Sequence, residues 1–186
     1  MSDMVSRTRT SLADRQQGCS GKNGRVLVLG LGNILLRDEG VGVHIAAELE
    51  KQDLPANVEI IDGGTAGLDV LLSQEGIDKL VVVDAVRFGK EPGTIYKIRL
   101  SVGEKGKLTQ IFGPDNESKI SLHQIGLIDA LAAAEKLSCA PREIVIIGIE
   151  PKEITHGLEL TEQVKRKIPK IVNTVLEEIN DAIHTR

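Results

Sequence analysis

Two carboxylates and one imidazole in this 186-residue chain are of the types that could converge to form a metal site. Glu39 follows a glycine-rich turn, Asp84 closes the apolar run LVVVD at residues 80–84, and His123 stands at the start of a predicted helix. Two carboxylate oxygens and one imidazole nitrogen form a borderline donor set that suits a divalent transition metal. Three protein ligands leave coordination positions open, so a metal held there could also contact a substrate.

The predicted position of His123 bears on its protonation. Residues 121–124 (SLHQ) have the Ser-x-x-Gln spacing of a capping box, which predicts that a helix begins there. The positive end of a helix dipole disfavours the imidazolium form, and a metal ligand must be the neutral ring. The predicted helix start therefore favours the ligand form of His123.

Each of these residues also has a purely structural interpretation. Asp38 and Glu39 precede a predicted helix and could interact with its N-terminus, while Asp84 could cap the turn that follows it. His123 could form a local hydrogen bond at its helix start. Residues 62–65 (DGGT) could be a tight turn in which the glycines adopt positive φ. Taken one at a time, general propensities favour these structural interpretations.

The elements that must position these residues follow from the apolar patterns. Apolar runs predict buried strands at 26–29, 80–84 and 143–149, and a further strand is predicted at 58–62. The alternation in 94–100 predicts an edge strand with one wet face. Helices are predicted near 41–50, after Thr65 as N-cap through Leu72, at 121–137 and at 164–183. Pro169 should either kink the last helix or mark its true beginning.

Strands that alternate with helices predict the α/β class. We expect a three-layer sandwich, in which a mostly parallel, twisted sheet of about five strands is flanked by helices. In open α/β sheets, ligands bind beyond the carboxyl ends of the strands. Glu39 and Asp84 both follow or end a predicted strand, so we expect them to lie at that end of the sheet.

The chain divides into a short tail and one domain. Residues 1–24 show no strand or helix period and are rich in Ser, Arg and Gly, which predicts a flexible N-terminal extension, whereas residues 25–186 predict a single α/β catalytic domain. No apolar run approaches the ~18 residues of a membrane span, and the tail lacks the hydrophobic stretch of a signal peptide. Cys19 and Cys139 cannot make a disulfide framework. We expect a cytoplasmic protein with no membrane partner.

Composition and motifs weigh against nucleic acid and nucleotides. Lys and Arg number 23 against 27 Asp and Glu, a net charge of −4, and three scattered aromatic residues cannot form a base-stacking platform. Gly30-x-Gly32 after a strand, with Glu59 or Asp62 further on, partly matches a dinucleotide fingerprint, but Leu35 occupies the position of its third glycine. Two acidic residues in the turn would repel a pyrophosphate. A Rossmann-like nucleotide-binding module remains the alternative.

Four separated segments together resemble the hydrogenase maturation endopeptidases. They are residues 29–42 (LGLGNILLRDEGVG), 62–67 (DGGTAG), 83–85 (VDA) and 121–127 (SLHQIGL). They occur in the order of that family, each falls on a predicted strand end or helix start, and the resemblance covers about residues 25–180. The N-terminal tail lies outside it.

The resemblance implies a protease that removes a C-terminal extension from the large-subunit precursor of a nickel-iron hydrogenase after nickel insertion. The metal-contacting residues of the family correspond to Glu39, Asp84 and His123, with Asp38 as their acidic neighbour; the family often has Asp where Glu39 stands. These four are the expected catalytic residues, and the expected substrate-binding residues are Asn33, Gly63, Gly64 and Thr65.

The same resemblance implies the partners and the metal. Nickel would arrive with the precursor, and no organic cofactor is expected. The metal would serve first as a recognition element; whether it also polarises the scissile carbonyl, or a carboxylate acts as general base on a water, is left open. The missing nucleophile motif favours direct hydrolysis over an acyl-enzyme. We expect a monomer, because no long heptad pattern is present. We expect the surface loop predicted at 101–118 to determine which precursor is cleaved.

Overall fold

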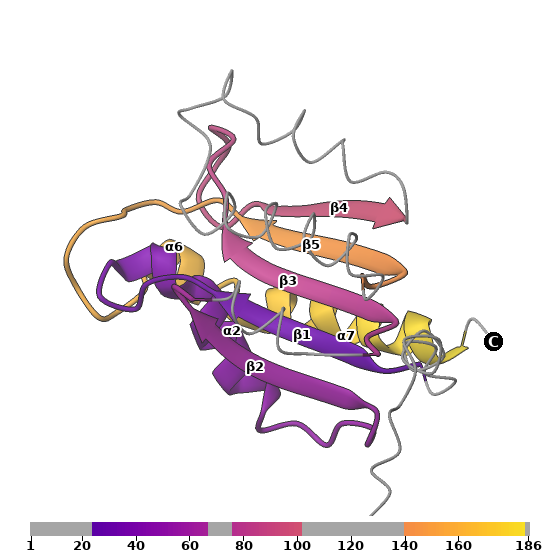
Figure 1. Cartoon of the computed structure of the whole chain (residues 1–186). Helices are drawn as coiled ribbons and strands as arrows, with labels where there is room; N and C mark the ends of the chain where they lie inside the picture. The colour runs from indigo at the N-terminus through magenta and orange to yellow at the C-terminus, as the bar shows by residue number, and fades with distance from the viewer. Residues whose placement is uncertain (1–23, 67–75, 102–139, 185–186) are drawn as a thin grey trace, which may run out of the picture.

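A computed structural model describes residues 24–66, 76–101 and 140–184. Its five strands form one sheet in the order β2-β1-β3-β5-β4 (Figure 1). The strands are β1 (Val26–Leu31), β2 (Val58–Gly64), β3 (Lys79–Ala85), β4 (Ile95–Ser101) and β5 (Glu143–Ile149). Neighbours among β2, β1, β3 and β5 run parallel, and β4 runs antiparallel to β5. The predicted α/β class and mostly parallel five-stranded sheet are confirmed.

The strand positions explain their sequences. β1 and β3 are buried along their whole length, as expected for central parallel strands that are covered on both faces. Among the described strands, β4 pairs with β5 alone, as expected for an edge strand. In its sequence, Tyr96, Ile98 and Leu100 alternate with Lys97 and Arg99. β2 continues through Gly64, two residues beyond the predicted strand, because the Gly32 N–H donates to the Gly64 carbonyl at 2.9 Å.

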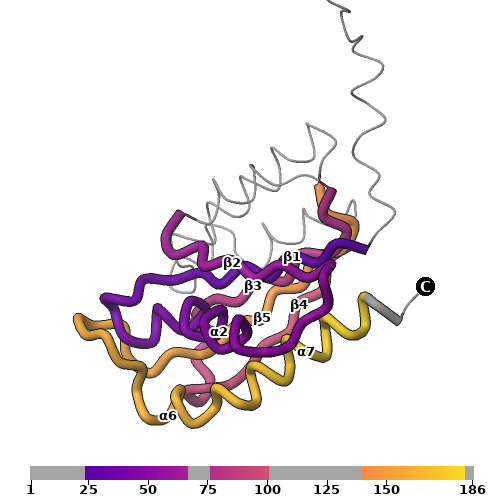
Figure 2. The backbone as a smooth tube through the Cα atoms, turned by 90° about the horizontal axis from the view of Figure 1, so that it is seen from below, coloured from indigo at the N-terminus to yellow at the C-terminus, as the bar shows by residue number. Residues whose placement is uncertain are grey.

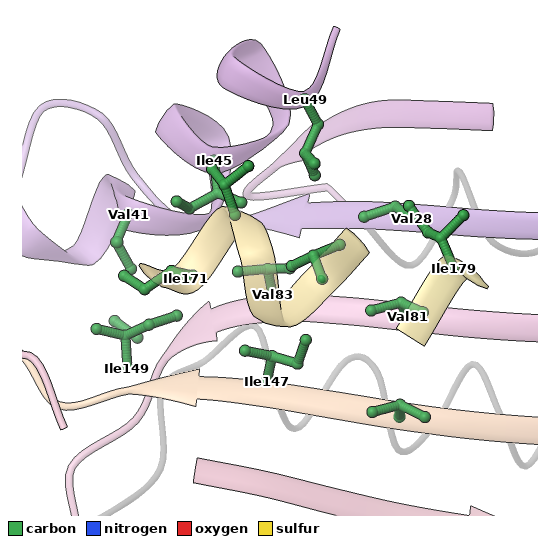
Figure 3. Packing of buried hydrophobic residues seen from close by; sticks show 14 of the residues in the cluster. Val28, Val41, Ile45, Leu49, Val81, Val83, Ile147, Ile149, Ile171 and Ile179 are labelled. Atoms are coloured by element: carbon green, nitrogen blue, oxygen red, sulfur yellow. The ribbon is translucent and has the colours of Figure 1, made fainter. Parts of the chain in front are cut away.

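Two helices cover one face of the sheet. Figure 2 shows α2 (Val41–Leu49) and α7 (Ile168–His184) on the same side of β1 and β3. Ile45 and Leu49 of α2 and Ile171 of α7 pack against the strands (Figure 3). Burial of each such side chain stabilises the fold by about 1.5–3 kcal/mol. The strand residues of this cluster include Val28, Val81, Val83, Val145, Ile147 and Ile149.

Buried apolar side chains also line the opposite face of the sheet. They include Leu27, Leu29, Leu80, Val82, Ile144 and Ile146. The helices predicted after Thr65 and at 121–137 lie outside the described residues, as do the loop predicted at 101–118 beyond Ser101 and the tail before Gly24.

The C-terminal helices settle the role of Pro169. A short helix α6 (Glu162–Lys165) precedes α7, which begins at Ile168. Pro169 therefore lies in the first turn of α7 and marks its true beginning rather than a kink, because a first-turn residue needs no N–H donor. Among the described residues, no helix combines the length and apolar character needed to cross a membrane.

Candidate functional site

The turn that carries Glu39 lies at the carboxyl end of the sheet. After β1 the chain forms this turn, which ends in the 3-10 helix η1 (Arg37–Gly40), and α2 follows directly. η1 contacts β3, whose last residues include Asp84. Since β1 and β3 are parallel neighbours, the structure brings Glu39 and Asp84 to the same end of adjacent strands, as expected. His123 lies outside the described residues.

Two glycines allow α2 to begin in backbone contact with the strand ends. A Cβ atom at Gly30 would overlap the Gly42 carbonyl and lie 2.9 Å from the Ala46 Cβ. A Cβ atom at Gly42 would overlap the carbonyl oxygens of Val83 and Leu31. No side chain therefore separates the start of α2 from β1 and β3. In this chain, the glycines of the first turn serve close packing between helix and strand.

The two candidate carboxylates have different surroundings. Glu39 is half-buried, and its carboxylate has no hydrogen bond or ion pair within the part of the chain that the structure describes. Asp84 is buried, and its Oδ1 accepts a hydrogen bond from the Ala85 N–H at 2.8 Å. Within the described residues, this end of the sheet therefore presents one carboxylate without a partner and a second carboxylate that the strand holds in place.

Asp38 has a different role from its neighbour. It is fully buried, and its carboxylate accepts hydrogen bonds from the backbone N–H groups of Lys152 at 2.9 Å, Glu153 at 3.1 Å and Thr161 at 2.7 Å. The Thr161 hydroxyl donates a fourth, at 2.8 Å. These bonds, rather than the N-terminus of α2, occupy the carboxylate of Asp38. Asp38 thus ties the turn before α2 to the loop 150–161.

Backbone hydrogen bonds join the same two segments. The Arg37 N–H donates to the Gly157 carbonyl at 2.8 Å, and the Gly157 N–H donates to the Leu35 carbonyl at 3.0 Å. Arg37 has a φ of +49°, which is costly for a residue with a side chain and persists only where the surroundings fix it. Figure 1 shows the turn after β1 and the loop after β5 side by side. The Glu39 turn is therefore held from two directions.

The predicted substrate-binding turns meet beside Glu39. The Asn33 Oδ1 accepts a hydrogen bond from the Leu35 N–H at 3.0 Å, which shapes the turn locally. Across the strand ends, the Asp62 Oδ1 accepts a hydrogen bond from the Gly64 N–H at 2.9 Å. The hydrogen bond from Gly32 to Gly64 links the ends of β1 and β2. The structure therefore gathers Asn33 and Gly64 at one end of the sheet.

The remaining residues of this set differ in accessibility. Gly63 is buried within β2, whereas Thr65 is exposed beyond its end. β2 runs through Gly64 and continues directly into a tight turn, which is closed by a hydrogen bond from the Ala66 N–H to the Gly63 carbonyl at 2.9 Å. Gly64 has a φ of +46°, as expected for a glycine in a tight turn. Unlike the buried Gly63, Thr65 has an exposed side chain that can contact a ligand.

Glu150, another acidic residue at a strand end, fixes a loop. Its carboxylate accepts hydrogen bonds from the backbone of Phe88 at 2.8 Å and Gly89 at 3.2 Å, and from the Tyr96 hydroxyl. Burial raises the pKa of Glu150, but the hydrogen bonds from Tyr96 and the backbone outweigh burial and leave the pKa below its ordinary value. Glu150 is therefore a structural carboxylate.

The sequence did not identify Thr161, and the structure does not describe His123. Thr161 contributes two hydrogen bonds to Asp38, yet the residues are 123 positions apart and no motif connects them. Among the described residues, no three His, Cys, Asp or Glu side chains are grouped to hold a metal, and the third expected ligand, His123, lies outside them.

Comparisons with known proteins agree with one another. A family model described as "Hydrogenase maturation protease" matches residues 43–178. Hydrogenase 2 maturation protease of Escherichia coli strain K12 is 36% identical over 160 residues, which are 85% of this chain and 92% of that protein. Hydrogenase expression/formation protein HupD of Bradyrhizobium diazoefficiens is 38% identical over 151 residues, which are 80% of this chain and 74% of that protein.

Solved structures show the same similarity. The hydrogenase maturating endopeptidase HybD from E. coli superposes with a TM-score of 0.73 at 36% identity and covers 85% of this chain and 93% of that one. The [NiFe] hydrogenase maturation protease HybD from Thermococcus kodakarensis gives a TM-score of 0.63 at 29% identity, covering 83% of this chain and 99% of that one. None of these similarities supports the nucleotide-binding alternative.

Proposed function

Because the chain belongs to the hydrogenase maturation protease family and is therefore a peptidase, we propose that it removes the C-terminal extension of a nickel-iron hydrogenase large-subunit precursor. One observation carries the proposal beyond the family: the Glu39 turn contacts β3, which holds Asp84, and α2 directly after that turn packs without an intervening side chain against the Val83 carbonyl. Glu39 has no partner among the described residues. A carboxylate kept in place and left unpaired suits a cation that arrives with the substrate.

The nickel belongs to the precursor in this proposal. Glu39, Asp84 and His123 receive it when the precursor docks, and this contact brings the scissile peptide to the site. Two carboxylates and an imidazole are suitable donors for a divalent transition metal, and none of these three is a thiolate. A precursor without nickel lacks that contact. The metal thus acts first as the signal that distinguishes a loaded precursor from an empty one.

Two schemes for peptide-bond cleavage fit these residues. In one, a carboxylate of the pair takes a proton from a water that attacks the scissile carbonyl, and the proton then goes to the leaving amine. In the other, the nickel of the precursor polarises that carbonyl. Asp38 is a positioning residue in both, because its oxygens already accept four hydrogen bonds. Asn33, Gly63, Gly64 and Thr65 contact the precursor beside the carboxylates.

We also propose that the enzyme acts as a monomer in the cytoplasm, without an organic cofactor. Two isolated cysteines suit a reducing compartment.

The test is cleavage of a defined substrate. The protein is mixed with a nickel-loaded large-subunit precursor and, separately, with the nickel-free form, and the products are weighed by mass spectrometry. The loaded precursor should lose the mass of its C-terminal extension, and the nickel-free precursor should not. His123→Ala should abolish cleavage while the thermal unfolding midpoint stays unchanged. Intact loaded precursors from several hydrogenases would contradict the proposal.

A further inference from the structure

We propose that Ile34, Leu35 and Leu158 form a docking surface for an apolar segment of the hydrogenase precursor. This surface rests on the proposed function and specifies how the substrate is held next to the metal-binding carboxylates. The three side chains are 45%, 57% and 65% exposed. Among the described residues, they are the large hydrophobic side chains left exposed, and apolar groups gathered in this way on a surface mark sites of interaction.

The three residues come from two segments that lie side by side. Leu36 forms a parallel β-bridge with Gly157, and the Gly157 N–H donates to the Leu35 carbonyl at 3.0 Å. Leu158 directly follows Gly157, so its backbone adjoins that of Leu35. Residues far apart in the chain thus form one surface.

This surface is continuous with the candidate site. Ile34 and Leu35 belong to the same turn as Glu39, and this turn folds back on itself, since a Cβ atom at Gly40 would lie 2.8 Å from the Ile34 Cα. A polypeptide bound at Glu39 therefore lies close to Ile34. The apolar side chains are placed to contact the part of the substrate that flanks its metal.

The surface is preorganised. The Asn33 carbonyl accepts a hydrogen bond from the Leu36 N–H at 3.0 Å, and the buried Asp38 carboxylate ties the turn to the loop 150–161. Residues whose backbone is fixed in this way lose little conformational freedom on binding. More of the free energy gained from apolar contact therefore contributes to affinity. A rigid apolar turn is more suited to a defined partner than to non-specific adhesion.

The position of the surface decides between the precursor and a second copy of this chain. A second copy seated on Ile34 and Leu35 would cover Glu39 and block the cleavage that the family performs. The rim carries charges of both signs, with Arg37 and Glu153 partly exposed around the apolar centre. An apolar centre with a polar rim is the anatomy of a transient protein interface. The precursor is therefore the occupant.

The experiment replaces the three side chains with serine, singly and together, and measures cleavage of nickel-loaded precursor. The triple variant should raise KM about tenfold and leave kcat within about twofold, because docking contacts hold the substrate and the transition state equally. Leu35→Met should retain the wild-type KM. Arg142→Ser is the surface control, since Arg142 is exposed and precedes β5 at the opposite end of the sheet. Thermal unfolding checks that every variant is folded.

The outcomes separate the docking surface from the proposed function. A triple variant that cleaves with the wild-type KM overturns the docking surface and leaves the proposed function standing. If the wild type fails to cleave, the proposed function fails, and affinities for immobilised precursor then decide the surface: a tenfold loss in the triple variant supports it, and equal affinities overturn it. Concentration-dependent dimerisation that the triple variant abolishes would assign the surface to a second copy and overturn the inference.

Discussion

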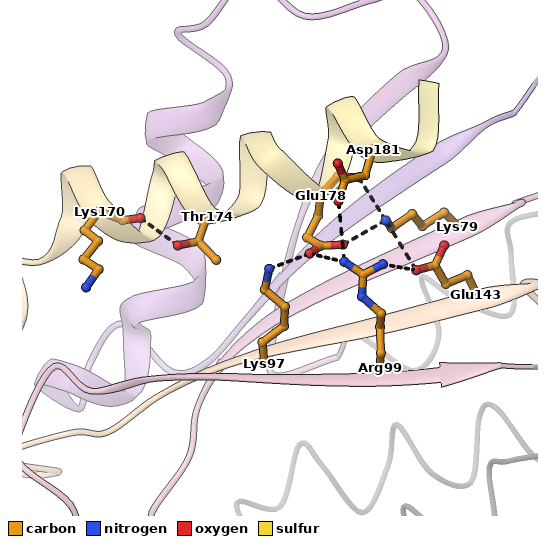
Figure 4. A network of polar contacts seen from close by, with 8 residues as sticks. All are labelled: Lys79, Lys97, Arg99, Glu143, Lys170, Thr174, Glu178 and Asp181. Atoms are coloured by element: carbon orange, nitrogen blue, oxygen red, sulfur yellow. Dashed lines mark hydrogen bonds and ion pairs between the residues drawn. The ribbon is translucent and has the colours of Figure 1, made fainter. Parts of the chain in front are cut away.

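The buried carboxylate of Glu178 contacts three cations at the amino end of the sheet, whereas Glu39 at the carboxyl end has no partner among the described residues. The Glu178 oxygens lie 2.9 Å from the Lys79 Nζ, 2.8 Å from the Lys97 Nζ and 2.7 Å from an Arg99 guanidinium nitrogen (Figure 4). Burial raises the pKa of Glu178, but Lys97, Lys79 and Arg99 outweigh burial and leave its pKa below the ordinary value.

The difference separates charges that stabilise the fold from charges that are available to a ligand. At the amino end, folding itself supplies the counterions, so α7 and the start of β3 are joined by an ion pair that needs nothing from outside. At the carboxyl end, Asp38 is satisfied by N–H and hydroxyl donors, and Glu39 is unpaired among the described residues. Substitutions at the amino end should therefore lower the stability of the fold, and substitutions at the carboxyl end should lower the rate of cleavage.

Glu178→Gln should have the largest effect on stability. It leaves the buried Lys79 ammonium with Glu143, at 3.5 Å, as its one anionic neighbour among the described residues, and breaking a buried pair costs about 3–5 kcal/mol. The free energy of unfolding, measured in urea, should fall by that amount, while cleavage per folded molecule stays unchanged. The double variant Lys79→Met/Glu178→Leu should recover most of the loss. A stable single variant would show that the pair contributes little.

Glu39→Gln should have the opposite profile. The amide keeps the shape of the side chain and removes the charge that receives the cation. Cleavage of nickel-loaded precursor should fall by at least about 100-fold, on the scale of altered metal surroundings. The urea midpoint should stay at the wild-type value, because the carboxylate has no partner to lose within the described residues. Full activity would remove Glu39 from the site.

Thr161→Val tests the connection between stability and function at the carboxyl end. The valine keeps the volume and removes the hydroxyl that donates to Asp38 at 2.8 Å. Stability should fall by about 1 kcal/mol, and kcat/KM should fall several-fold if the bond positions the Glu39 turn. Thr161→Ser should restore both quantities. A loss of stability with unchanged kcat/KM would confine Asp38 to a structural role.

The smallest expected effect is on the acid dependence of stability. The folded pKa of Glu178 is below its ordinary value of 4.5, so the stability that it contributes is present above pH 4.5 and is lost as the pH falls through the folded value. The free energy of unfolding of the wild type should therefore decline more steeply below pH 4.5 than that of Glu178→Gln. Parallel pH profiles would contradict the assignment.

Local sequence patterns predicted the strands well. The range of β5 was predicted without error, and β1, β3 and β4 were predicted to within two residues at each end, because continuous or alternating apolar runs directly reflect burial on two faces or one. β2 also ends two residues later than predicted, because its hydrogen bonds continue through Gly63 and Gly64 into the tight turn that these glycines indicated. The apolar pattern predicts a strand where side-chain burial determines the structure. It is less informative where backbone hydrogen bonds determine where the strand ends.

Long-range polar contacts were beyond the sequence. The resemblance to the family and the predicted strand ends identified Glu39 and Asp84 as site residues, and the structure places both at one end of the sheet. The sequence also grouped Asp38 with them as a catalytic residue, but its partners Lys152 and Thr161 lie more than 100 positions away. A single sequence carries no record of such pairs. The ligand role of His123 stays a prediction, since that residue lies outside the described residues.

The contact of Gly30 and Gly42 with neighbouring backbone has a consequence for how this protein can vary. Because α2 meets β1 and β3 through peptide groups, the dimensions of the main chain set the spacing between the Glu39 turn and Asp84. Core side chains such as Ile45 or Ile171 can change in size with compensating changes nearby and leave that spacing intact. One added methyl group at Gly30 cannot be compensated in this way. Engineering for heat resistance can therefore begin in the core and should leave these two glycines untouched.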